Sequence, residues 1–140
     1  MPLLAITLIL IFSASAVADD SAITPCTQRE ERQALETVDA LKNWHQVYRS
    51  YKRYSQCDDG AIAEGYSDVV AKLLANDWKH FDQLIALSNS DKQFRKFVLN
   101  HINTTADDRD LLKLSRNAQS NCPVRGQELC RLIVSAAAPR

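Results

Sequence analysis

The chain has 140 residues and carries 17 basic and 17 acidic side chains, so its formal net charge is zero with histidine neutral. A balanced charge gives no long-range field that would attract nucleic acid or an anionic membrane. Only three glycines and four prolines are present, which leaves little turn chemistry for β-hairpins. The composition therefore favours an all-α protein and argues against nucleic acid as a partner.

The N-terminal segment has the order of a secretory signal peptide. An apolar run from Leu3 to Phe12 leads to Ala16-Val17-Ala18, an A-x-A cleavage pattern. The run is too short for a comfortable transmembrane span, and two acidic residues follow the pattern at once. We therefore expect residues 1–18 to be a signal peptide. Residues 19–140 should form a single helical domain, periplasmic or secreted, with no membrane anchor after cleavage.

From Thr27 onward, apolar residues recur at three- and four-residue spacings, the period of amphipathic helices. Thr27 and Glu30 fit a capping box, which predicts a first helix from residue 28 to about residue 54. An Asp of the segment Cys57–Gly60 is expected to cap a second helix. This helix should reach Asn76-Asp77, where the chain is expected to bend.

Further helices are predicted in the C-terminal half. Ser90 with Gln93 forms another capping-box candidate, and Thr104 or Thr105 is expected to start the next helix. Pro123 should end that helix, since proline cannot continue it, and a short last helix is predicted around Gln127–Val134. The expected fold is a compact, disulfide-stapled bundle of five to six helices.

Four cysteines are expected to be oxidised outside the cytosol: Cys26, Cys57, Cys122 and Cys130. An unbroken helix from residue 28 to residue 54 would be roughly 40 Å long. Bonded Cα atoms lie within about 7 Å, so Cys26 and Cys57 should not pair. The favoured pairing is Cys57–Cys122 with Cys26–Cys130, which closes two long loops. The alternative is a Cys122–Cys130 bond that leaves Cys26 and Cys57 as thiols.

The sequence contains no recognised catalytic or cofactor motif, since G-x-S-x-G, the P-loop, C-x-x-C and the EF-hand loop are all absent. His45, His80 and His101 lie in or beside helical apolar patterns, where a hydrogen-bonded structural histidine is typical. We therefore expect no catalytic residue, no metal and no cofactor, and disfavour an enzyme. Asn103 begins a glycosylation sequon, which matters only in a eukaryotic host.

Aromatic and basic residues crowd the first predicted helix. Tyrosine and arginine commonly anchor protein interfaces, because they combine a large contact area with polar atoms. The candidate partner-binding residues are Tyr48, Arg49, Tyr51 and Arg53. The same stripe could equally be core, with the tyrosine hydroxyls at its rim.

The segment from Tyr54 to Pro123, which begins YSQCDDGAIAEGYSDVV and ends HINTTADDRDLLKLSRNAQSNCP, resembles secreted bacterial proteins of uncharacterised function. The overall architecture, with a signal peptide and few cysteines, also resembles small all-helical periplasmic proteins such as the amidase immunity proteins of type VI secretion. This resemblance implies an immunity-like or inhibitor-like protein that binds another protein outside the cytoplasm. The alternatives are a carrier of a small apolar ligand and an enzyme with an unrecognised site, and a homodimer stays open.

Overall fold

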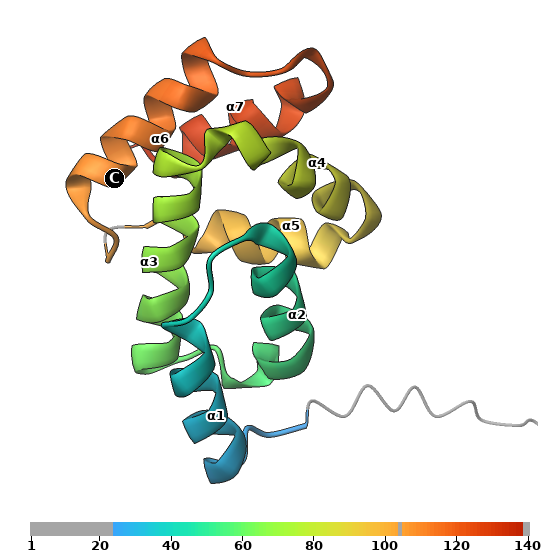
Figure 1. Ribbon diagram of the computed structural model, residues 1–140, viewed down its shortest axis with the longest axis vertical. Coiled ribbons are helices and arrows are strands. Elements are labelled where there is room, and N and C mark those ends of the chain that lie inside the picture. The colour runs from blue at the N-terminus through green and yellow to red at the C-terminus, as the bar shows by residue number, and fades with distance from the viewer. Residues whose placement is uncertain (1–23, 104, 139–140) are drawn as a thin grey trace, which may run out of the picture.

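The computed structural model describes residues 24–103 and 105–138, so the predicted signal peptide lies outside the described residues. The described residues form no strand, which confirms the all-α prediction. They form seven α-helices, more than the five or six expected (Figure 1). The helices are α1 (Gln28–Val38), α2 (Trp44–Tyr54), α3 (Gly60–Asn76), α4 (Phe81–Ser90), α5 (Lys92–Asn100), α6 (Asp108–Ser120) and α7 (Gln127–Ala136).

The predicted long first helix is wrong, because the chain breaks into α1 and α2. Asn43 has extended backbone angles and caps α2, its side chain accepting a hydrogen bond from the Gln46 backbone N–H at 3.0 Å. The Gln46 side chain in turn accepts from the Lys42 backbone N–H at 2.7 Å. In a continuous helix these two backbone amides would instead donate to carbonyls one turn earlier. The chain therefore turns back, and α2 packs against α1 as a helical hairpin.

The hairpin overturns the favoured disulfide pairing. It brings Cys26, before α1, next to Cys57, after α2, and the two are bonded with their Cα atoms 4.9 Å apart. The second disulfide joins Cys122 and Cys130, so neither Cys57–Cys122 nor Cys26–Cys130 forms. The alternative had the Cys122–Cys130 bond right, but Cys26 and Cys57 are not thiols. Two disulfides indicate an oxidising compartment.

Helix α3 lies at the centre of the fold and packs against both α1 and α6 (Figure 1). Nine of its 17 residues are buried, among them Tyr66, Val70 and Leu74. Gly65 lets α1 approach closely, because a Cβ there would lie only 2.7 Å from Cγ1 of Val38. The close packing of α1 on α3 therefore requires a glycine at residue 65.

Two helix starts differ from the predicted positions. Helix α4 continues through Ser90, and Asp91 rather than Ser90 caps α5, accepting from the Phe94 backbone N–H at 2.9 Å. Helix α6 is capped by Asp107 and not by Thr104 or Thr105. In both cases an aspartate that directly precedes the helix accepts a hydrogen bond from a free amide of the first turn. The capping box at Thr27, the Asp cap of α3 and the end of α6 before Pro123 are confirmed.

Candidate functional site

The four predicted partner-binding residues lie on α2 but on two different sides of it. Tyr48 and Tyr51 are half-buried, whereas Arg49 and Arg53 are exposed. The Tyr48 ring packs edge-on against Phe94 of α5, with the ring centres 4.9 Å apart, and its hydroxyl donates a hydrogen bond to Asp91. The tyrosines therefore cover the core between α2 and α5, and only the arginines face solvent.

Tyr51 extends the same aromatic cluster. Its ring centre lies 5.3 Å from that of Phe94 and 4.8 Å from that of Phe97. Burial raises the pKa of the Tyr51 hydroxyl above its usual value, with the charge of Asp91 as a second cause. A neutral hydroxyl at the rim of a core is the arrangement expected for a packed tyrosine.

Arg49 and Arg53 line a cleft between α1 and α2, with a volume of about 450 Å³. Neither guanidinium forms an ion pair with any described residue. The guanidinium carbon of Arg53 lies 5.1 Å from the centre of the Tyr54 ring, within cation–π range. The other lining residues are Thr37, Ala40, Leu41, Gln46, Ser50 and Tyr54. The cleft thus offers two unpaired cations beside a ring.

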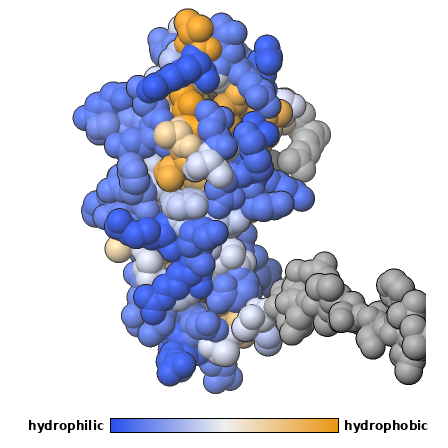
Figure 2. Space-filling view, turned by 90° about the vertical axis from the view of Figure 1, so that its right-hand side faces the viewer, coloured by the Kyte–Doolittle hydropathy of each residue, from blue (hydrophilic) through white to orange (hydrophobic). Residues whose placement is uncertain are grey.

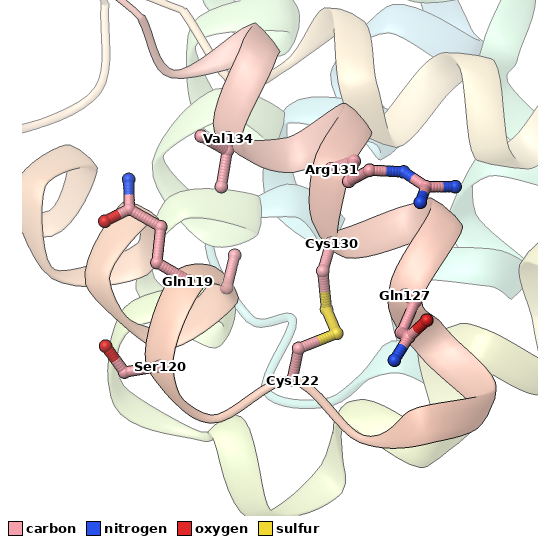
Figure 3. A pocket seen from close by; sticks show the side chains of 8 residues that line it. Gln119, Ser120, Cys122, Gln127, Cys130, Arg131 and Val134 are labelled. Carbon is pink, nitrogen blue, oxygen red and sulfur yellow. A yellow bond between two sulfur atoms is a disulfide. The ribbon is translucent and has the colours of Figure 1, made fainter.

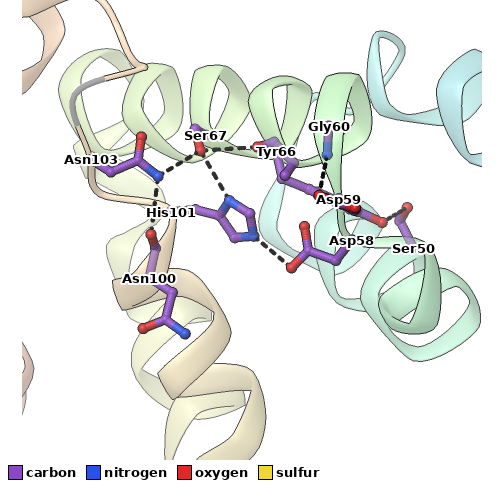
Figure 4. Close-up of polar contacts among 10 residues, drawn as sticks. Ser50, Asp58, Asp59, Gly60, Tyr66, Ser67, Asn100, His101 and Asn103 are labelled. Atoms are coloured by element: carbon purple, nitrogen blue, oxygen red, sulfur yellow. Dashed lines mark hydrogen bonds and ion pairs between the residues drawn. The ribbon is translucent and has the colours of Figure 1, made fainter. Parts of the chain in front are cut away.

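A second candidate is a buried polar network around His101 (Figure 4). Its Nδ1 lies 3.0 Å from Oγ of Ser67, and its Nε2 lies 3.0 Å from Oδ2 of Asp58. The His101 ring thus bridges a serine on α3 and an aspartate before α3. Ser, His and Asp are the residue types of a hydrolase triad, so the question is whether Ser67 could act as a nucleophile.

The Ser67 hydroxyl is committed to the fold. The residue is 1% exposed, and its Oγ lies 3.0 Å both from the Ala63 carbonyl oxygen and from His101 Nδ1, while it accepts from the Asn103 amide at 3.1 Å. A nucleophile needs room for a substrate beside its oxygen. The network therefore joins the turn before α3, α3 itself and the end of α5. It agrees with the structural role expected for His101.

The C-terminal helices α6 and α7 enclose an open apolar groove of about 760 Å³ at the end of α7. Leu112 lines it on the α6 side, with 61% of its surface exposed. Figure 2 shows a different face, the right-hand side of Figure 1, on which apolar side chains gather in the upper half of the molecule. Around α1 and α2 the same face is mostly hydrophilic. The groove lining includes Ile102, Leu111, Leu112, Ser115, Val134 and Ala137.

This groove continues into a second hollow of about 570 Å³, because Gln119 and Val134 line both. In Figure 3 these two side chains come from the two helices and flank the gap, and the Cys122–Cys130 disulfide lies between α6 and α7. Arg131 lies at this end, whereas Asp108 lines the opposite end. The two hollows together form what we call the α6–α7 groove.

No protein-family model, no curated protein and no solved structure matches the chain. Within residues 24–103 and 105–138, no three His, Cys, Asp or Glu side chains gather as metal ligands would. None of the helices in the same residues combines the length and apolarity that crossing a membrane requires. Three surfaces or clusters therefore remain to be weighed: the α1–α2 cleft, the His101 network and the α6–α7 groove.

Proposed function

We propose that this protein is a non-enzymatic module that binds another protein outside the cytoplasm, through the α1–α2 cleft. One observation supports the proposal above the rest: Arg49 and Arg53 line the cleft together without any carboxylate partner among the described residues. Arg95, by contrast, pairs with Glu128 at 3.1 Å. Here the pairing groups are expected to come from the partner.

The partner chemistry follows from the spacing of the two arginines. Residues four apart on a helix lie one above the other, with Cβ atoms about 5–6 Å apart. Two guanidinium groups at that spacing can each take a carboxylate in a bidentate pair. The buried Tyr54 ring, 5.1 Å from the Arg53 guanidinium carbon, packs beneath that side chain. The cleft therefore suits an acidic segment of another protein.

Tyr48 and Tyr51 contribute indirectly in this proposal. Their rings pack on Phe94 and Phe97, which holds α2 in place before any partner arrives. A surface that is already ordered loses less conformational entropy when it binds. The aromatic half of the predicted patch thus supports the helix, and the basic half makes the contact.

An immunity-like or inhibitor-like role fits these features. Such a protein needs a rigid scaffold and an accessible recognition surface, and it works in the compartment where the two disulfides persist. Complementary charge at a contact speeds association and gives specificity, and Arg49 and Arg53, which have no ion-pair partner within residues 24–103 and 105–138, can supply it. The partner would then present carboxylates at the contact.

Affinity capture with the mature, secreted chain tests the proposal. The double variant Arg49→Ala/Arg53→Ala should lose a partner that the wild-type chain retains, with affinity reduced about tenfold or more. Arg32→Ala is the matched control, because Arg32 is exposed on α1 but does not line the cleft. The melting temperature should be nearly the same for all three proteins. Equal retention by the wild-type chain and the double variant would reject the cleft as the binding surface.

A further inference from the structure

The α6–α7 groove has a charge distribution that is complementary to itself. Asp108 lies at one end, in the first turn of α6, and Arg131 lies at the other end, on α7. Neither forms an ion pair with another described residue. Between them the part lined by α6 and the end of α7 is mainly apolar and includes the exposed Leu112, whereas Gln119, Ser120 and Gln127 line the part nearer Arg131. An exposed apolar strip with polar ends is typical of a protein interface.

We propose that a second copy of this chain occupies the groove, forming a dimer with two-fold symmetry. In such an interface each residue pair occurs twice, because the same surface meets itself. A two-fold axis through the middle of the groove, near Ser115 and Val134, exchanges its ends. Asp108 of each copy then faces Arg131 of the other, so both charges gain a partner.

The apolar contacts follow from the same symmetry operation. Two concave surfaces cannot pack face to face, so the α6 ridge of each copy must enter the groove of the other. Leu112 is the exposed apolar side chain on that ridge. Two α6–α7 pairs brought together in this way form a four-helix arrangement, which buries apolar helix faces. The open space beside Leu112 is thereby filled.

The dimer surface is separate from the proposed partner site. The α1–α2 hairpin and the α6–α7 pair lie at opposite ends of the molecule (Figure 1). A dimer would therefore carry two α1–α2 clefts, both free. The proposal goes beyond the function proposed above, and each can fail without the other.

Sedimentation velocity across a range of concentrations tests the dimer. The wild-type chain should sediment as a dimer at high concentration and dissociate on dilution. Leu112→Asp should weaken the dimer by about tenfold or more, since it places a charge in the desolvated contact. Val124→Asp is the matched control, because Val124 is 85% exposed and lies outside the groove. That variant should behave as wild type.

Charge reversal tests the orientation of the two copies. Asp108→Arg alone places two cations opposite each other, and Arg131→Asp alone places two anions together, so each variant should be mainly monomeric. A mixture of the two variants should form a heterodimer, because both cross-pairs are then attractive. A double variant carrying both changes should also regain the dimer. An intramolecular effect of either change cannot produce rescue by mixing.

Three results would overturn the proposal. The first is a wild-type chain that stays monomeric at every concentration, and the second is a dimer that Leu112→Asp and Val124→Asp affect equally. The third is a monomer whose groove takes up a fluorescent fatty acid and loses it in Leu112→Asp, which would make the groove a ligand site. Circular dichroism of every variant separates loss of association from loss of folding. Capture of the partner by the α1–α2 cleft is measured independently.

Discussion

Gly65 and Val38 meet at the crossing of α3 and α1, where a Cβ on Gly65 would lie 2.7 Å from Cγ1 and 3.0 Å from Cγ2 of Val38. Both Val38 atoms belong to a side chain that is 1% exposed. A β-branched side chain has few alternative rotamers, so it cannot simply swing away. The distance between the two helices is therefore set by the absence of a side chain at residue 65.

Gly65→Ala should destabilise the protein by about 1–3 kcal/mol, the usual range for overpacking a tight core. Chemical denaturation of the wild-type chain and the variant measures the change. Val38→Ala makes room for the new methyl group, so the double variant should lose less stability than the sum of the two single changes. Strict additivity would show that the two residues do not compete for the same space.

The two disulfides should differ in their contribution to stability. The Cys26–Cys57 bond closes a loop with a sequence separation of 31, and the Cys122–Cys130 bond one of 8. Loop-closure entropy then predicts about 3.7 kcal/mol for the first bond and about 2.5 kcal/mol for the second. Urea denaturation of the paired Cys→Ser variants compares them.

Non-reducing peptide mapping of the wild-type chain gives the control for that comparison. It should recover a Cys26–Cys57 peptide and a Cys122–Cys130 peptide. Recovery of a Cys57–Cys122 or Cys26–Cys130 peptide would mean that the α1–α2 hairpin is not formed in the folded protein.

The sequence predicts helix ends correctly where a capping box or a proline marks them. Thr27 and Glu30 mark the start of α1, and Pro123 marks the end of α6. The break before Asn43 was missed because Val38, Leu41 and Trp44 keep three-residue spacing through the gap. The apolar period therefore continues where the helix does not. The error in the disulfide pairing followed from that single missed turn, because an unbroken helix would have held Cys26 and Cys57 far apart.

The sequence predicts the helices better than it predicts the surface features. Helical periodicity places Tyr48 on the apolar face and Arg53 on the opposite face, but whether the tyrosines meet a partner or the core depends on where α5 packs. The His101 network joins residues 58, 67 and 101, which come from three separate segments with no fixed spacing. The α6–α7 groove requires the relative position of two helices. None of these relationships is local in the chain.

Ser67→Ala should destabilise the fold by about 1–3 kcal/mol, although it removes only one oxygen atom. The change leaves His101 Nδ1 and the Asn103 amide without the partner that they share in the buried network. Thermal denaturation measures the loss. Ser135→Ala is the matched control, because Ser135 is exposed on α7 and should tolerate the change. A stability loss no larger than that of the control would show that the network contributes little.

Asp91 should make the stability of the α4–α5 junction depend on acidic pH. The hydrogen bond from the Phe94 backbone N–H lowers the pKa of the Asp91 carboxyl below 3.8, and the Tyr48 hydroxyl and Lys52 add to the effect. A lowered pKa in the folded state means that the ionised form stabilises the fold. This stabilisation is complete above the unfolded value and is lost as the pH falls through the folded pKa.

Carboxyl NMR titration of Asp91 measures this pKa directly, and Tyr48→Phe should raise it toward 3.8 by removing one hydrogen bond to the carboxylate. Tyr54→Phe is the control, because the Tyr54 hydroxyl donates to Gln33 and not to Asp91. In urea denaturation, Asp91→Asn should lose the acid-dependent part of the stability, since an amide caps the helix without titrating. An Asp91 pKa at or above its usual value would contradict the cap geometry. An unchanged pKa in Tyr48→Phe would contradict the contact between α2 and the start of α5.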